Sequence, residues 1–276
     1  MATRTLARPN WIGGSFAVAW LLIILLPVYL MVRAALESRA AYTSGGPLAP
    51  PTEFTLENFG LSFELGFGHY LLNAAIITVG TVAIVLVLVP PLAYAIVRSR
   101  SRGVKTVFRL LLIGLAIPAQ VVVIPLYYLI NSIGLYDSLL GVILPTAAFV
   151  IPLTTLILTG SMREINNELY EAISMDGAGP IRTFFTLVVP LSRGGIATII
   201  VYSALNAWNG FLLPLILTRS PEVMVATVGL SSFRQQYSVN IPGLMSAVIL
   251  TIIPIFVVYL FARRSLVAGL MGVGGK

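Results

Sequence analysis

The chain has 276 residues, of which 58% are hydrophobic and 10% are charged, with no cysteine and one histidine. A typical soluble domain carries about 25% charged residues, so this composition excludes an ordinary soluble protein and indicates an integral membrane protein. The net charge of +7 comes from Lys and Arg residues that flank apolar runs, and this distribution argues against nucleic acid as a partner.

Six apolar runs are long enough to cross a bilayer, which takes about 20 helical residues. Because the runs are continuous and do not alternate, they predict an all-α polytopic fold with six transmembrane helices and exclude a barrel. In chain order the predicted spans are 11–32, 70–97, 108–130, 139–159, 196–217 and 244–262. Pro90 and Pro91 in the second span, and Pro118 and Pro125 in the third, can break backbone pairing where neighbouring helices or a cavity restore it.

The Lys and Arg residues indicate which segments face the cytoplasm. Most of the 17 Lys and Arg residues lie in the two termini and in the links that follow spans two and four. The four exceptions are Arg33, Arg39, Arg219 and Arg234. The positive-inside rule therefore predicts that both termini and segment 161–195 are cytoplasmic, whereas 34–68 and 219–243 are external. The first run is too long for a cleavable signal peptide. We expect an anchor helix and external loop at 1–69, a core at 70–268 and a cytoplasmic tail at 269–276.

Segment 161–195 is the longest predicted cytoplasmic loop, and its sequence predicts a short polar helix. Asn166 or Asn167 can cap the helix start, and Gly177 or Gly179 can take the left-handed backbone that ends it. Pro180 suits the first turn of a second helix. Acidic side chains favour the first turns of the polar helix, namely Glu168 and Glu171. Small and apolar side chains recur on one face that a partner must cover, namely Ile165, Leu169, Ala172 and Ile173.

The residues of this segment resemble the cytoplasmic EAA loop of permease subunits of bacterial ABC importers. The matching order is Glu171-Ala172-Ile173, three residues, Gly177, nine residues, Leu187, one residue and Val189-Pro190. Ile173 stands where that family usually has alanine. Shorter matches extend the resemblance over nearly the whole chain, toward the second permease of maltose-type carbohydrate importers; they are 124–127, 134–135, 143–145, 175–178, 207–209 and 267–270.

The resemblance implies the type I permease fold and a division of labour among subunits in a bacterial cytoplasmic membrane. This chain would be a non-catalytic permease that pairs with a second permease, while an extracellular substrate-binding protein delivers the solute. A separate dimer of ATP-binding subunits would bind ATP and Mg²⁺, which agrees with the lack of a phosphate-binding loop in this sequence. The residues that would couple to the ATPase are Glu171, Ala172, Ile173, Asp176, Gly177 and Ala178, with backbone or Arg partners expected for both carboxylates.

The spans themselves indicate the kind of solute. None of the ten acidic residues lies in the core of a predicted span, which disfavours an ion-coupled transporter and favours a neutral solute. Sugars are bound by amides near aromatic rings. The candidates of these types are Asn206, Trp208, Asn209, Phe211 and Tyr127, although packing against the second permease explains the amides equally well.

These observations favour a permease for a di- or oligosaccharide. An importer of the same architecture for glycerol phosphate or another polar solute is the first alternative. A membrane-embedded lipid-modifying enzyme is an alternative of another class, but it would need a group of His, Asp or Glu residues that this sequence does not offer.

Overall fold

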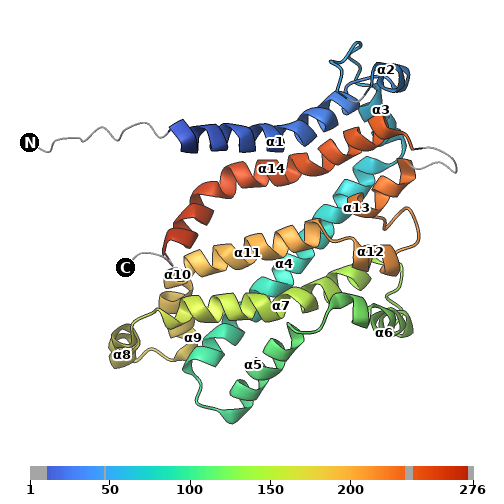
Figure 1. Cartoon of the computed structure of the whole chain (residues 1–276). Helices are drawn as coiled ribbons and strands as arrows, with labels where there is room; N and C mark the ends of the chain where they lie inside the picture. Colours follow the sequence, from blue (N-terminus) through green and yellow to red (C-terminus); the bar gives the residue numbers. More distant parts are fainter. Residues whose placement is uncertain (1–10, 47, 234–238, 273–276) are drawn as a thin grey trace, which may run out of the picture. The chain divides into compact units, whose positions relative to one another are not determined.

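The computed structural model of the chain describes residues 11–46, 48–233 and 239–272 (Figure 1). These residues form helices and no β-strand, so the predicted all-α fold is confirmed for the described part of the chain. Two compact units are present. One runs to Gly66 and includes Leu230–Ile252, and the other comprises Phe67–Gly229 and the chain from Ile253.

The first unit consists of a long apolar helix, two short helices and the beginning of the last helix. Its elements are α1 (Trp11–Ala35), α2 (Arg39–Gly45), α3 (Glu57–Glu64), the 3₁₀ turn η2 (Leu230–Phe233) and the first turns of α14 (Ile241–Gly272).

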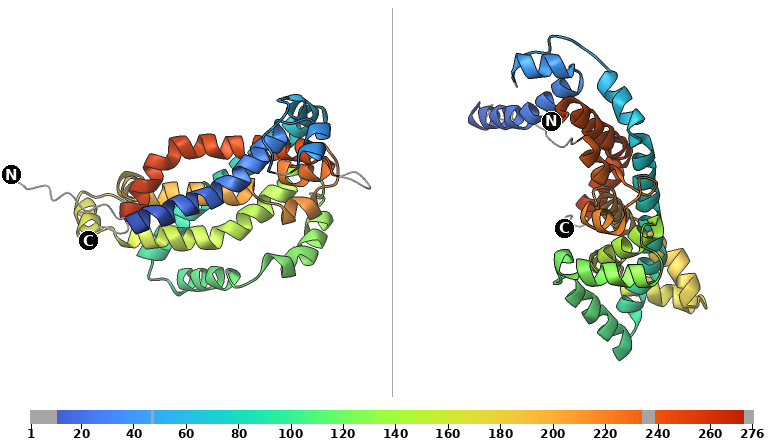
Figure 2. Two further views of the ribbon diagram at one scale, coloured as in Figure 1. Left: turned by 45° about the horizontal axis from the view of Figure 1, so that its top comes forward. Right: turned by 90° about the vertical axis from the view of Figure 1, so that its right-hand side faces the viewer.

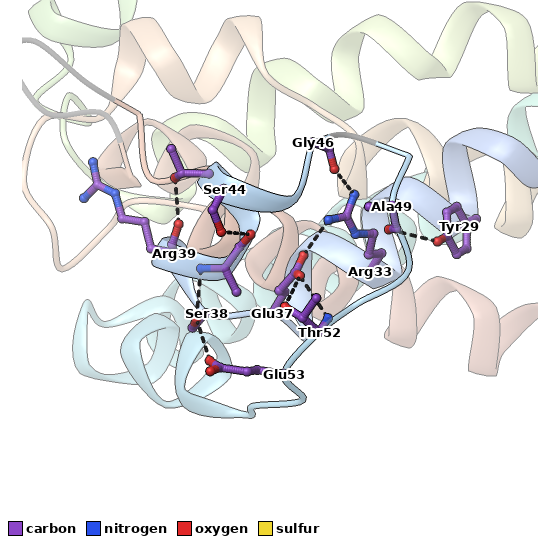
Figure 3. Close-up of polar contacts among 12 residues, drawn as sticks. Tyr29, Arg33, Glu37, Ser38, Arg39, Ser44, Gly46, Ala49, Thr52 and Glu53 are labelled. Carbon is purple, nitrogen blue, oxygen red and sulfur yellow. Dashed lines mark hydrogen bonds and ion pairs between the residues drawn. The ribbon is translucent and has the colours of Figure 1, made fainter.

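The loop that follows α1 is fixed by buried polar contacts around Glu37. Arg33, at the end of α1, forms an ion pair with Glu37 at 2.9 Å, and both side chains are buried (Figure 3). The other carboxylate oxygen of Glu37 accepts the Thr52 backbone N–H at 3.2 Å. Asn58 of α3 donates its amide protons to the carbonyls of Ala35 and Glu37, at 3.0 and 2.9 Å. Buried charges are tolerated because each finds partners of this kind.

The second unit is built around three long helices. Its elements are α4 (Phe67–Arg98), α5 (Arg102–Gly114), α6 (Ala119–Ser132), α7 (Leu139–Arg163), α8 (Asn167–Met175), α9 (Pro180–Thr183), the π-helix η1 (Phe184–Val188), α10 (Val189–Leu191), α11 (Arg193–Trp208), α12 (Leu212–Leu217) and α13 (Ala226–Gly229).

Helices α4, α7 and α11 lie side by side and enclose the core of this unit (Figures 1 and 2). Fully buried side chains from each helix meet there, among them Val89 of α4, Leu158 of α7 and Ile199 of α11. Gly195 allows close approach of α11 to α7, because a Cβ at that position would lie 2.7 Å from the Ser161 hydroxyl oxygen. The three helices thus form a tightly packed frame for the segments between them.

The apolar helices agree with the predicted spans. Among the described residues, α1, α4, α7 and the Ile241–Val258 part of α14 are long and apolar enough to cross a membrane. Two bent helix pairs would bring the number to six if each is one span: α5 with α6, bent by 109°, and Pro180–Leu191 with α11, bent by 77°.

Two predicted spans are interrupted, whereas the prolines inside α4 and α6 do not end their helices. The third predicted span is split after Gly114, because Pro118 caps α6 and disfavours helical geometry at the residue before it. The fifth ends at Trp208, and a separate short helix starts at Leu212. At Pro90 and Pro91 helix α4 continues, and α6 likewise continues through Pro125, so these prolines lie within helices.

Candidate functional site

The short polar helix predicted in segment 161–195 is α8, and both of its ends are fixed by hydrogen bonds. The Asn166 side chain accepts the Glu168 backbone N–H at 3.1 Å, so Asn166 is the cap. At the other end the N–H of Gly177 bonds to the Ser174 carbonyl at 3.0 Å, and the N–H of Ala178 to the Ile173 carbonyl at 3.2 Å. With Gly177 at φ +72°, this is the Schellman arrangement.

A second short helix follows at once, as predicted. Pro180 occupies the first turn of α9, where its missing N–H costs nothing. The helix continues as the π-helical stretch Phe184–Val188 and ends at Leu191, directly after Pro190. Gly179 does not end α8; its φ of −72° is extended backbone, and it precedes α9.

One side chain of α8 is buried in the packed frame. Tyr170 is 3% exposed and belongs to the core cluster with residues of α4, α7 and α11. Burial raises the pKa of its hydroxyl, an effect that nearby Arg98 opposes, so the phenol is neutral at physiological pH. Within the described residues this hydroxyl has no hydrogen-bond partner, so Tyr170 is held in place by the packing of its aromatic ring.

Arg98, the last residue of α4, binds α8 from the side. Its guanidinium carbon lies 4.1 Å from the centre of the Tyr170 ring, a cation–π distance. The same guanidinium donates a hydrogen bond to the Asn167 side-chain oxygen at 3.1 Å. From the sequence, Arg98 is expected only to mark a cytoplasmic link, and Tyr170 is not singled out. The aromatic ring of Tyr170, the one aromatic side chain in α8, was the signal that could have identified the buried position.

The six predicted coupling residues lie in α8 and in the turn that follows it, and most of them are exposed. Glu171, Ala172, Asp176 and Gly177 are exposed, whereas Ile173 and Ala178 are half-buried. In the part of the chain that the structure describes, neither carboxylate side chain has a hydrogen bond or ion pair, so their expected partners remain a prediction about other subunits.

Large apolar side chains are exposed next to these residues. Met175 at the end of α8 is 88% exposed, and Ile181 in α9 is 77% exposed. Leu169 of the expected apolar face and Phe185 of the π-helix are also exposed. Apolar side chains of this size at the tip of a capped polar helix form a surface that can be buried by a partner.

The predicted substrate residues do not all face the same environment. Asn206 and Asn209 are exposed, and the amide nitrogen of each donates to the carbonyl four residues earlier at 2.9 Å. Their amide oxygens remain available as acceptors. Phe211, just beyond α11, is 51% exposed, but Trp208 is only 8% exposed and packs inward.

Tyr127, the remaining substrate candidate, lies in α6 within a group of aromatic rings. It is half-buried, and its ring centre is 5.6 Å from that of Tyr128 and 5.4 Å from that of Tyr136, both edge to face. The five candidates therefore come from separate elements and differ in exposure: Tyr127 lies in α6, and Trp208 is buried, whereas Asn206, Asn209 and Phe211 are exposed.

Among the described residues, no three His, Cys, Asp or Glu side chains are close enough to hold a metal ion. The histidine, His69, lies with its Nε2 atom 2.7 Å from the Glu222 carbonyl oxygen, where it joins the start of α4 to the loop before α13. This geometry gives His69 a structural contact.

Known proteins with similar sequences and folds are membrane components of importers. The chain is 32% identical to a putative ABC transporter permease, ORF2, of Caldicellulosiruptor over 93% of each chain. It is 29% identical to the diacetylchitobiose uptake permease NgcG of Streptomyces coelicolor, over 92% of this chain and 85% of that protein. A crystal structure of a bacterial ABC transporter that imports alginate has the same fold, with a TM-score of 0.79, 24% identity and coverage of 95% and 99%.

The family model for binding-protein-dependent transport system inner membrane components matches residues 91–271, which include the whole of α7, α8 and α11 and the end of α4. The predicted resemblance is thereby confirmed, and the alternative of a lipid-modifying enzyme is set aside, since members of this family are non-catalytic permeases. The chain belongs to the family of inner membrane components of binding-protein-dependent transport systems and is a multi-pass permease subunit of an ABC importer.

Proposed function

We propose that this permease carries a di- or oligosaccharide and that α8 is the element through which an ATP-binding subunit drives it. The observation that carries the proposal is the construction of α8. Its two ends are closed by hydrogen bonds, Tyr170 is buried in the frame, and Glu171, Asp176 and Met175 are exposed. A short rigid helix of this kind transmits a push to the frame with little internal deformation.

The partners follow from the family. A second permease would complete the pathway, a dimer of ATP-binding subunits would bind ATP and Mg²⁺ on the cytoplasmic side, and a binding protein would deliver the sugar outside. The exposed Glu171 and Asp176 would find backbone or Arg partners in the ATP-binding subunit. Met175 and Ile181 would supply apolar contact area, which is the usual core of such an interface.

A sugar fits the exposed amides of α11. Asn206 and Asn209 lie three residues apart and so share a helix face, with both amide oxygens available to accept sugar hydroxyl protons. Phe211 and Tyr127 would offer aromatic faces for stacking, whereas Trp208 is buried. The diacetylchitobiose-specific relative supports a di- or oligosaccharide over glycerol phosphate.

The proposed topology places both termini in the cytoplasm, with an anchor and external loop at 1–69, a core at 70–268 and a tail at 269–276. The unit boundary after Gly66 lies close to the first of these divisions, although Leu230–Ile252 packs with the first unit. Helix α14 extends to Gly272, and the last residues of the proposed tail, 273–276, lie outside the described residues.

Co-purification tests the coupling role. A tagged permease, expressed with its partner subunits, should retain the ATP-binding subunit, and Glu171→Ala should reduce the amount retained. Gly177→Pro should abolish it, because proline cannot adopt the positive φ of that position. Glu164→Ala is the matched control, since Glu164 is also an exposed acidic residue of the segment but precedes α8. Full retention by Glu171→Ala and Gly177→Pro would refute the proposal.

A further inference from the structure

Arg98 and Tyr170 join α8 to a helix that the family motif does not include. The motif residues belong to α8 and to the helix after it, whereas Arg98 ends α4, one of the three helices of the frame. The contacts are specific: the guanidinium lies 4.1 Å from the Tyr170 ring centre and donates to Asn167 at 3.1 Å. The two contacts involve positions three residues apart, which share one face of α8.

The two contacts of Arg98 depend on the shape of its guanidinium group. An arginine guanidinium is flat, so it can stack on an aromatic face and donate in its own plane at the same time, which a lysine ammonium cannot do. Tyr170 is buried and Asn167 is exposed. The guanidinium therefore contacts one residue on the buried side of α8 and one on its exposed side. This arrangement fixes the rotation of α8 about its own axis and its distance from the end of α4.

We propose that Arg98 is a positioning residue that makes α8 and the cytoplasmic end of α4 move as one body, so that each ATPase stroke delivered to α8 displaces α4. The inference rests on the proposed coupling role of α8. Without the Arg98 contacts, α8 would still hold the ATP-binding subunit through its exposed residues. It would, however, rotate against the end of α4 when it is pushed, and α4 would be displaced less. ATP hydrolysis would then continue with less transport.

The test measures uptake and ATP hydrolysis separately in the complete transporter, reconstituted in liposomes with its binding protein. The probes are labelled di- and trisaccharides, and the one that the wild type transports best is used for every variant. Arg98→Ala should keep the bound ATP-binding subunit and ATP hydrolysis but transport about tenfold less sugar per ATP, the change expected from a loss of about 1.4 kcal/mol.

Two variants separate positioning from general charge and packing. Arg100→Ala removes an exposed cation two residues away, for which the described residues show no contact, and should transport as the wild type does. Tyr170→Phe keeps the ring and removes a hydroxyl without a partner, so it should also be unaffected, whereas Tyr170→Leu should be uncoupled like Arg98→Ala. Equal losses in Arg98→Ala and Arg100→Ala would overturn the inference.

Arg98→Lys serves if Arg98→Ala does not assemble, because it keeps the positive charge that orients the chain. It should show an intermediate loss, because an ammonium cannot stack on the Tyr170 ring and donate to Asn167 at the same time. Wild-type sugar transport per ATP in Arg98→Lys and Arg98→Ala would refute the positioning role. If ATP-binding subunit retention proves independent of Glu171, the coupling proposal fails first, whatever Arg98 does.

Discussion

The carboxylate of Asp137 accepts the backbone N–H of Arg219 at 2.7 Å and that of Ser220 at 3.0 Å, across 82 residues of sequence. Asp137 also donates its own N–H to the Leu217 carbonyl at 2.9 Å, so the turn between α6 and α7 is tied to the end of α12. Its φ of +55° is unusual for a residue other than glycine. The three bonds hold Asp137 in this backbone conformation.

Removal of the Asp137 carboxylate should destabilise this connection. Asp137→Ala leaves two N–H groups without their acceptor and places alanine at positive φ, with an expected cost of about 1–3 kcal/mol. Asp137→Asn keeps an oxygen acceptor, and asparagine tolerates positive φ, so this variant should lose much less stability than Asp137→Ala. Thermal unfolding of the purified protein in detergent compares the two variants. Equal melting temperatures for Asp137→Ala and the wild type would contradict this role.

The same contacts predict how stability depends on pH. The backbone N–H of Arg219, then that of Ser220, lowers the pKa of Asp137 below its ordinary value. A depressed folded-state pKa means that the stabilisation is present above the unfolded pKa of about 3.9 and is lost as pH falls through the folded value. The wild type should therefore be more stable to unfolding than Asp137→Asn at neutral pH, and this difference in stability should decrease as the pH falls below about 4. A stability difference between the wild type and Asp137→Asn that does not decrease at lower pH would contradict the depressed pKa of Asp137.

The left-handed turn after α8 should be sensitive to any side chain. At Gly177 an added Cβ would meet no atom within 4 Å, but its φ of +72° makes Gly177→Ala cost about 1 kcal/mol in backbone strain alone. Gly179→Ala is the control, because that position has equal space and an ordinary φ of −72°. Retention of the ATP-binding subunit should fall for Gly177→Ala and not for Gly179→Ala; similar retention in both would show that the turn is not required.

The close approach of α11 to α7 gives a prediction about packing. A Cβ at Gly195 would lie 2.7–3.0 Å from atoms of Ser161 and Leu158, so Gly195→Ala should push the helices apart at a cost of about 1–3 kcal/mol. Gly160 in α7 has no atom near its Cβ position, and Gly160→Ala should be neutral or slightly stabilising. Thermal unfolding distinguishes them, and unchanged stability of Gly195→Ala would mean that the helices are not packed as described.

The sequence was sufficient for features that depend on local patterns. The length of the apolar runs predicted the spans, and the spacing of Asn166, Gly177 and Pro180 predicted the start of α8, its end and the start of α9. The exact position of Gly177 in the Schellman turn could not be separated from Gly179, because both glycines allow positive φ and the choice depends on hydrogen bonds to residues 173 and 174.

Features that depend on contacts distant in sequence were missed. Nothing local distinguishes Arg98 from the other cations around it, and its role follows only from the position of Tyr170 across 72 residues. Asp137 lies in a loop without any motif, and the N–H donors to its carboxylate, those of Arg219 and Ser220, become evident only when α12 is in place. Trp208 was grouped with Asn209 by chain proximity, but adjacent residues on a helix point in different directions, and the indole packs inward.

The central claim, that α8 contacts the ATP-binding subunit, can be tested by site-specific cross-linking. The chain has no cysteine, so Met175→Cys would introduce a single reactive thiol at a position that is 88% exposed. Leu48→Cys, 64% exposed in the loop after α2, is the control on the proposed external side. In the intact transporter Met175→Cys should cross-link to the ATP-binding subunit, and an impermeant thiol reagent added outside cells should label only Leu48→Cys. External labelling of Met175→Cys, or no cross-link in an assembly that retains the ATP-binding subunit, would contradict the account.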